Sequence, residues 1–370
     1  MIRLGIKSRK KRGADYIIVS CVIILTAFGL VMLSSASSNL GQAKFGDSYY
    51  YLKHQIFYGL SFGILGFFIG SRIYYRRYEK FAFAFLIISL ILLGLVFTPL
   101  GFKTKGAARW LSLGPVTFQP SEIAKMAFVL YLAAWLGRRP ERQVDLFKGF
   151  LPFLLVLGVL SGLLLRQPAT SAAAIIILTA LVVYFASGAR WKYIFWLILL
   201  VALAFLVVTY FTPYRWDRIV NFIQPESDIG KGGYHLNQAL NAIGSGGLWG
   251  VGYGQSIAKL KYLPEPVGDS IFAIIAEELG FVGAIALLLA FFSFIMRVFL
   301  MARKYPDKFG QLILAGFGTL LALQVAINIG SISGLIPLTG VPLPFISYGG
   351  TALAVFMTMG GIVVNISKYA

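Results

Sequence analysis

The chain has few of the residues that carry redox or metal chemistry. A single cysteine, Cys21, among 370 residues excludes a disulfide within the chain, and we interpret it as a small residue packed in an apolar segment. Only two histidines are present, and no second ligand stands at a metal-binding spacing from His235, so no zinc site is predicted and no metal-ligating residue is assigned. Charged residues make up 13% of the chain and hydrophobic residues 58%, which excludes an ordinary soluble domain. The composition predicts an all-α, polytopic integral membrane protein.

Acidic residues are scarce as well, with 14 Asp and Glu against 33 Lys and Arg. In a soluble protein a net charge of +19 would suggest nucleic acid, but here the basic residues fall in short loops between apolar runs. Most of these loops lie on the side of the N-terminus, and such an excess marks the cytoplasmic side of a membrane protein. We therefore predict no nucleic-acid partner and place both termini in the cytoplasm.

Apolar runs of about 17 to 25 residues, the length that crosses a bilayer, predict about ten transmembrane helices. The first follows a basic cytoplasmic arm, 1–14, and is interpreted as an uncleaved anchor. The long extracytoplasmic loop 212–268, between the seventh and eighth helices, contains an amphipathic piece that predicts short interfacial helices. We expect one membrane domain, 1–370. The predicted spans are 15–36, 53–71, 80–99, 121–136, 149–166, 170–187, 193–211, 270–299, 311–332 and 345–366.

Three carboxylates stand at the eighth span, where a membrane chain should have none. Asp269 heads the apolar run, and Glu277 and Glu278 lie inside it. A charge at mid-bilayer costs at least ~2.5 kcal/mol, so such groups normally face a cavity or a partner. On a continuous helix, Asp269 and Glu277 border one cavity, whereas Glu278 contacts another helix or a basic partner. Capping of the helix is an equally weighted role for Asp269.

Another outer segment carries charges against the positive-inside trend. The third-to-fourth connection holds Lys103, Lys105 and Arg109, and it leads into a helix with Glu122 and Lys125 in its first turn. The spacing i,i+3 lets those two pair on one face. An anionic ligand at the outer leaflet would need such a cluster, although lipid headgroup contact and a purely structural pair are the alternatives.

Two further connections face the same side. Arg166 stands at the rim of the short fifth-to-sixth connection. The last connection, 333–351, contains Ser347, three prolines and no charge. Irregular backbone at membrane depth is tolerated only where protein or a water-filled cavity surrounds it. We therefore expect this segment, with Ser347, to line the same cavity.

Basic residues that hold a pyrophosphate, beside one carboxylate, suit glycosyl transfer from a lipid-linked donor. A positioned general base contributes roughly 10²–10⁴ in rate when a poor nucleophile such as a sugar hydroxyl attacks. The leaving pyrophosphate develops charge that Arg, Lys or a divalent metal stabilises. A direct displacement with one base inverts the anomeric centre. No cofactor is certain, and a divalent cation, Mg²⁺ or Mn²⁺, is left open.

Three ordered segments of the chain resemble the SEDS family, the FtsW and RodA proteins of bacterial cell-wall synthesis. They are FQPSEIAK (118–125), YLPEPVGDSIFAIIAEELG (262–280) and NIGSISGLIPLTGVPLPFISYGGTA (328–352). The resemblance runs through nearly the whole chain. It implies a peptidoglycan glycosyltransferase in the bacterial cytoplasmic membrane that polymerises lipid II on the outer face, for division or elongation, together with membrane lipid and a class B penicillin-binding transpeptidase.

The resemblance also implies roles for particular residues. Asp269 matches the family's essential aspartate, which would deprotonate the GlcNAc 4-hydroxyl of the acceptor as it attacks the MurNAc anomeric carbon and expels undecaprenyl pyrophosphate. Arg109 matches the arginine of the motif GA-x-RW, and Glu122 and Lys125 match a polar pair of the fourth helix. We therefore predict Asp269 as catalytic. The predicted substrate-binding residues are Arg109, Glu122, Lys125, Arg166, Glu277 and Ser347.

The chain departs from the family pattern at two positions. Ala169 replaces an aspartate that many members carry after Gln-Pro, so a second carboxylate there is absent. Ser270 replaces a phenylalanine that often follows the aspartate, a change we expect to affect packing rather than proton transfer. Segments 237–247 and 252–256 resemble FtsW more, while 340–345 resembles RodA more. We favour FtsW.

Two other classes of function remain open on the sequence. A lipid II flippase would also need intramembrane carboxylates, although the charged residues gather at the outer rim and no matching path of acids is visible on the inner side. A scaffold that only positions its transpeptidase would tolerate neutralisation of Asp269.

Overall fold

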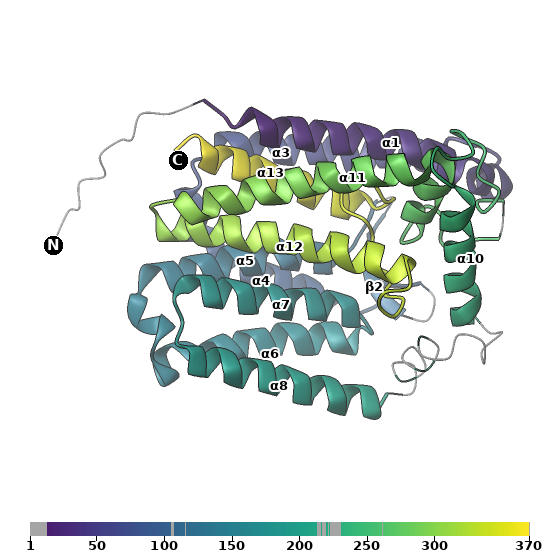
Figure 1. Cartoon of the computed structure of the whole chain (residues 1–370). Coiled ribbons are helices and arrows are strands. Elements are labelled where there is room, and N and C mark those ends of the chain that lie inside the picture. The colour runs from purple at the N-terminus through teal and green to yellow at the C-terminus, as the bar shows by residue number, and fades with distance from the viewer. Residues whose placement is uncertain are drawn as a thin grey trace.

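The chain is mostly helical in the computed structural model (Figure 1). The structure describes residues 13–104, 107–114, 116–212, 216, 220, 222, 231–260 and 262–369. Residues 1–12 of the predicted basic arm, and most of 213–230 in the predicted loop, lie outside these ranges. The helices are α1 (Tyr16–Phe45), α2 (Tyr50–His54), the π-helix η1 (Gln55–Leu60), α3 (Ser61–Arg72), α4 (Arg76–Leu95), α5 (Pro120–Arg138), the 3₁₀-helix η2 (Pro140–Gln143), the π-helix η3 (Leu146–Phe150), α6 (Leu151–Arg166), α7 (Thr170–Ser187), α8 (Trp191–Tyr210), α10 (Lys231–Ser245), α11 (Ile271–Lys304), α12 (Lys308–Ile332) and α13 (Gly350–Ser367).

Among the described residues, nine helical segments are long and apolar enough to cross a membrane. They confirm the predicted polytopic membrane fold, and one of them, Tyr50–Arg72, joins α2, η1 and α3. The predicted span 121–136 corresponds to α5, which is not among the nine. Its Glu122 and Lys125 lower the mean hydropathy of a helix that is otherwise apolar and mostly buried.

The central helices are α12 and α13, and in each of them 72% of the most apolar 18-residue stretch is buried. α13 packs along α3, and α12 packs against α5, α7 and α11. The α3–α13 contact depends on Gly361, where an added Cβ would clash with the backbone of Phe67. In contrast, only 22% of the corresponding stretch of α8 is buried, so this helix turns its apolar side chains outward, where lipid would surround it.

Both described ends of the chain lie at one end of the helical bundle (Figure 1). The backbone N–H of Asp15 donates to Ser367 Oγ at 3.0 Å, and the Asp15 side chain caps α1 by accepting from the N–H groups of Ile17 and Ile18. Ion pairs link further helices at this end: Arg297 Nε with Asp15 Oδ2 at 2.7 Å, Arg76 with Asp307 at 2.6 Å, and Arg138 with Glu79 at 2.9 Å.

A small antiparallel sheet at the opposite end was not predicted. Its strands are β1 (Gly101–Thr104), β2 (Ala107–Leu113) and β3 (Val116–Phe118), in the order β1-β2-β3. Leu111 is paired with Gly101 on one side and with Phe118 on the other. Gly114, with φ 66°, permits the tight turn between β2 and β3. The sheet thus replaces what the sequence suggested to be a plain connection.

The prediction of a continuous eighth helix is wrong at Gly280. This residue has φ 66° and ψ −167°, which breaks α11 after its first nine residues. Val251 N–H donates to the Glu277 carbonyl at 3.0 Å and Gly252 N–H to the Glu278 carbonyl at 3.0 Å, so the long loop takes over hydrogen bonds that the helix loses. The loop therefore inserts beside the kink and changes what surrounds both glutamates.

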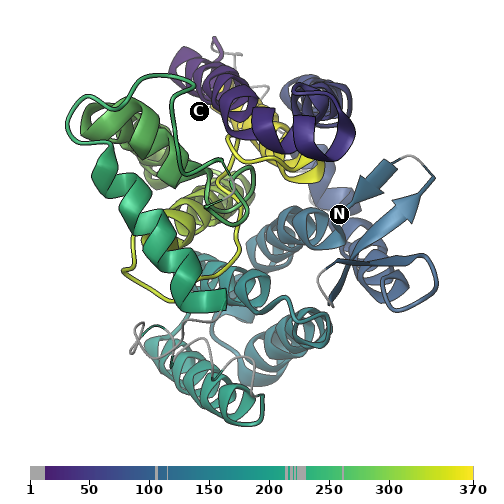
Figure 2. The ribbon, with the colours of Figure 1, turned by 90° about the vertical axis from the view of Figure 1, so that its right-hand side faces the viewer.

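The amphipathic piece of the long loop forms a helix, as predicted. α10 runs across the bundle at the end that carries the sheet (Figures 1 and 2). Its buried residues Leu236, Ala239 and Ala242 join the apolar core, and the helix packs on α11. Figure 2 looks onto this end and shows α10 and the sheet on different sides of it. They form part of the surroundings of one cavity.

Candidate active site

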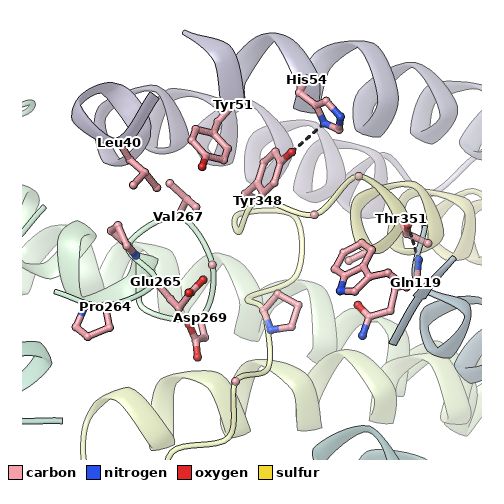
Figure 3. A pocket seen from close by; sticks show the side chains of 18 of the residues that line it. Leu40, Tyr51, His54, Gln119, Pro264, Glu265, Val267, Asp269, Tyr348 and Thr351 are labelled. Carbon is pink, nitrogen blue, oxygen red and sulfur yellow. Dashed lines mark hydrogen bonds between the residues drawn. The ribbon is translucent and has the colours of Figure 1, made fainter. Parts of the chain in front are cut away.

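A cavity of about 2430 Å³ is shown from close by in Figure 3. The elements that line it meet at the end of the bundle opposite the two described chain ends in Figure 1. Its walls combine segments that are far apart in the sequence. They come from α1, α2, η1, α3, the sheet, α5, α10 and the start of α13, and from the loops 259–269 and 338–349. Of the predicted site residues, Asp269 and Arg109 lie on the wall.

Asp269 is held by its backbone rather than placed on a helix. α11 begins at Ile271 with Ser270 at its N-cap, so Asp269 is not the capping residue. Asn328 Nδ2 donates to the Asp269 carbonyl at 2.8 Å, and Ser347 Oγ donates to the carbonyl of Gly268 at 2.6 Å. The half-buried carboxylate faces the cavity from a loop that is anchored on both sides (Figure 3).

Ser347 lies behind the wall, whereas the sequence led us to expect it on the lining of the cavity. It is buried, and its hydroxyl also accepts from the backbone N–H of Leu343 at 2.8 Å. One side chain therefore joins the loop 338–349 to the loop that carries Asp269. The expected proximity of the two segments holds, but in this structure Ser347 supports the wall.

Arg109 reaches the cavity from β2. Its guanidinium donates to the carbonyls of Gln167, with Nε 3.3 Å away, and Pro168. These carbonyls belong to the corner between α6 and α7, where Ala169 stands at the N-cap of α7 without a side-chain cap. These hydrogen bonds fix the sheet to the helical bundle. Arg109 thus brings a permanent positive charge to the cavity that Asp269 also lines.

Glu122 and Lys125 form the predicted pair, but they lie beneath the cavity wall. Lys125 Nζ is 2.8 Å from Glu122 Oε1, and each side chain is only 4% exposed. Lys125 Nζ also donates to Gln324 Oε1 at 2.5 Å, and Gln324 Nε2 donates to the carbonyl of Pro342 at 3.2 Å. Because Pro342 does line the cavity, this buried network connects α5 and α12 to its wall.

Glu277 does not border the cavity, contrary to the position expected for it on a continuous helix. The kink and the inserted loop turn it toward Ser256, whose hydroxyl donates to it, and toward the backbone N–H of Ile257 at 2.9 Å. Glu278 has a basic partner, as predicted, in Lys259 Nζ at 2.8 Å. Ser35 of α1 donates to Glu278 Oε1 at 2.6 Å, so the two glutamates hold the folded loop.

Arg166 also lies away from the cavity wall. It ends α6, is exposed, and places its guanidinium over the ring of Phe97, 5.3 Å from the ring centroid. Among the described residues, no group of three or more His, Cys, Asp and Glu is arranged to hold a metal ion.

The sequence prediction missed several wall residues. Glu265 lies four residues before Asp269 in the same motif, and Figure 3 shows both carboxylates in one part of the cavity. On another wall, His54 Nδ1 is 2.9 Å from the hydroxyl of Tyr348, and Tyr51 meets the Tyr348 ring edge-on at 5.0 Å. Burial raises the pKa of the Tyr348 phenol well above its usual value. Glu265 could have been found from the sequence, because it lies four residues before Asp269. The contacts of Tyr348 with Tyr51 and His54 could not, because they join segments that are far apart in the chain.

The comparisons with known proteins agree with this architecture. The family of cell cycle proteins that comprises FtsW, RodA and SpoVE matches residues 15–370. A probable peptidoglycan glycosyltransferase FtsW of Geobacter sp. (strain M18) is 36% identical over 362 residues, covering 97% of this chain and 98% of the relative. Stage V sporulation protein E of Bacillus subtilis (strain 168) is 34% identical over 362 residues, covering 98% and 99%.

Solved structures are similar over the same length. One similar structure is a chain of a peptidoglycan synthase complex, described for its structural coordination of polymerization and crosslinking. Its superposition gives a TM-score of 0.78 at 30% sequence identity and covers 96% of this chain and 97% of that one. The rod shape determining protein RodA of Thermus thermophilus gives a TM-score of 0.72 at 30% identity, covering 96% and 98%.

Proposed function

The chain belongs to the FtsW, RodA and SpoVE family of cell cycle proteins, and from this premise we propose how it works as a peptidoglycan glycosyltransferase. Relatives named as probable peptidoglycan glycosyltransferases cover almost the whole chain. The proposed substrate is lipid II, polymerised into β-1,4-linked glycan strands. The observation that carries the proposal is Asp269, anchored on both sides of its peptide and facing a cavity that also receives Arg109.

In the proposed reaction Asp269 acts as the general base. Its carboxylate accepts the proton of the acceptor's GlcNAc 4-hydroxyl while that oxygen forms a bond to the anomeric carbon of the donor MurNAc. The bond between this carbon and the undecaprenyl pyrophosphate breaks, and the pyrophosphate leaves with the electron pair. Arg109 stabilises the negative charge that develops on the leaving group. Because the hydroxyl attacks opposite the leaving group, the configuration inverts.

A divalent cation remains part of the proposal. Asp269 and Glu265 offer carboxylate oxygens on one part of the wall, which is the donor type that Mg²⁺ and Mn²⁺ prefer. Bound there, such a cation would supply further charge stabilisation for the pyrophosphate. The residues of this chain would hold and orient it.

We also propose the orientation and a partner. The excess of basic residues at the end that carries both described chain ends supports cytoplasmic termini and an extracytoplasmic cavity. The similarity to a chain of a complex that coordinates polymerization and crosslinking supports a crosslinking partner, for which we propose a class B penicillin-binding transpeptidase. The relatives named FtsW favour a role in division over elongation.

The position of the cavity favours polymerisation over lipid flipping. Its lining residues come from one end of the bundle, whereas a flippase must offer its substrate a path from both faces. A scaffold without activity would need no carboxylate facing a cavity.

The test is polymerisation of lipid II by the purified protein, with and without its transpeptidase, and with and without a metal chelator. We expect Asp269→Ala and Asp269→Asn to lose roughly 10²-fold or more in rate while thermal unfolding stays close to that of the parent. Restoration of a chelated sample by Mg²⁺ or Mn²⁺ supports the cation. A parent that forms no polymer even with its partner, or an Asp269→Asn protein at the parent's rate, contradicts the proposal.

A further inference from the structure

A hydrogen bond joins α10 to the residue that follows Asp269. His235 lies on α10 and lines the cavity, and its Nε2 is 2.7 Å from the hydroxyl oxygen of Ser270. Ser270 is completely buried at the start of α11. From the sequence we expected a serine at position 270 to affect packing rather than proton transfer. The structure instead gives it a polar partner from the long loop.

The geometry fixes which atom donates. The Ser270 hydroxyl has one proton, and it donates this proton to the carbonyl of Pro264 at 2.8 Å. Its oxygen must then accept from His235, so Nε2 carries a proton. Nε2 keeps that proton in the cationic imidazolium as well, and the bond therefore persists in either charge state.

Three anchors thus act on three successive residues around Asp269. Ser347 binds the carbonyl of Gly268, Asn328 binds the carbonyl of Asp269, and His235 binds the hydroxyl of Ser270. They come from the loop 338–349, from α12 and from α10, respectively. A carboxylate on a loop has no helix or strand to orient it, so the combined anchors set its direction.

We propose that His235 is a positioning residue that acts on Asp269 through Ser270, so that the long loop sets the geometry of the general base. The inference rests on the proposed role of Asp269. α10 is itself seated by Leu236, Ala239 and Ala242 in the core. The hydrogen bond transmits that placement to the cavity wall, to which both Pro264 and Asp269 belong (Figure 3).

The experiment compares substitutions that remove or keep the donor. His235→Met removes it at similar side-chain length, His235→Gln keeps an amide N–H at the place of Nε2, and Ser270→Ala removes the acceptor. Polymerisation kinetics are measured for the full chain with its transpeptidase. We expect His235→Met and Ser270→Ala to lower kcat about tenfold, with KM within about twofold, because a misplaced base slows chemistry more than binding. His235→Gln should retain kcat within about threefold of the parent.

The deciding measurement is the double variant. If His235 acts through Ser270, His235→Met combined with Ser270→Ala loses no more than the worse single variant, whereas independent effects multiply to about a hundredfold. Ser34→Ala serves as the matched control, since it removes a serine hydroxyl that is 2.6 Å from Tyr253 of the same loop, away from the cavity. We expect it to keep the parent kcat.

Three outcomes would overturn the inference. They are a double variant whose loss in kcat equals the product of the two single losses, a parent-like kcat for His235→Met, and a His235→Gln protein as slow as His235→Met. Should His235→Met fail to fold, Ser270→Ala alone decides in its place. A kcat about tenfold below the parent with KM within about twofold supports the inference, and a parent-like kcat overturns it. Failure of the proposed function is distinguished by Asp269→Asn, which would then polymerise like the parent whatever the His235 variants do.

Discussion

Asp269 depends on residues outside the cavity for the position of its carboxylate. Asn328 is the most buried of these, and its single amide group donates to two carbonyls, those of Asp269 at 2.8 Å and Val341 at 2.7 Å. Both carbonyls belong to loops that form the cavity wall. The amide therefore couples local stability to the geometry of the site.

We expect Asn328→Leu to reduce both stability and catalysis. The substitution removes the donor from the buried carbonyl of Val341, at about 1–3 kcal/mol, and from the part-buried carbonyl of Asp269, whose peptide it releases. Thermal unfolding should shift downward by several degrees, and kcat per folded molecule should fall at least about tenfold. The measurements are a thermal melt in detergent and a lipid II polymerisation assay.

Asn365 provides the matched control at the other end of the bundle. It is equally buried in α13, accepts from the backbone N–H of Tyr75 at 2.9 Å and donates to the carbonyl of Ser71 at 2.9 Å. Asn365→Leu should lower the melting temperature comparably and leave kcat per folded molecule unchanged. Equal kcat for the two leucine variants would show that Asn328 supports the fold alone.

The residues of the site differ in how far the sequence could predict them. A carboxylate at the head of an apolar run, Asp269, is costly in a membrane and therefore conspicuous. Asn328 and His235 are single polar residues on helices, a pattern shared with many residues that serve packing alone. Their partners are main-chain or hydroxyl groups of distant loops, and no spacing within the sequence brings those together.

At the scale of elements, hydropathy placed the helices well because burial in lipid needs a long apolar run. The strands of 101–118 and the break in α11 were not predictable in the same way. The break depends on a loop inserting from 247–252, and the periodicity of 270–299 alone contains no sign of it. From the sequence we placed Glu277 at the cavity because we derived the direction of this side chain from an unbroken helix.

We expect Gly280→Ala to destabilise the fold through the kink. Alanine at φ 66° is strained, and its Cβ would clash with the backbone of Gly250 and Leu248 in the inserted loop. The free energy of unfolding should fall by at least about 1–3 kcal/mol, measured by thermal or denaturant unfolding. Gly158→Ala in α6 is the control, because its Cβ would meet open space and alanine favours a helix by about 0.5–1 kcal/mol. A Gly280→Ala protein as stable as Gly158→Ala would contradict the assigned kink.

At the scale of the whole molecule, the two ends of the bundle have different chemistry. One end holds the ion pairs of Asp15, Glu79 and Asp307, the basic connections and both described chain ends, and the other holds the sheet, α10 and the cavity. α11 runs from one end to the other, which makes it a suitable gauge of orientation (Figure 1). Trp249 precedes it near the cavity end and is 79% exposed, and the exposed Lys304 is its last residue.

We predict that the cavity end faces outward from the cytoplasm. In a Cys21→Ala background, which removes the single native thiol, Trp249→Cys should react with a membrane-impermeant maleimide in intact spheroplasts. Lys304→Cys should react only after the membrane is opened. The physical reason is the excess of basic residues at the Lys304 end, which resists translocation across the membrane. The reverse labelling pattern would place Asp269 in the cytoplasm and would contradict polymerisation on the outer face of the membrane. Labelling of both cysteine variants in intact spheroplasts would indicate a leaky membrane, which labelling of a cytoplasmic marker protein would reveal.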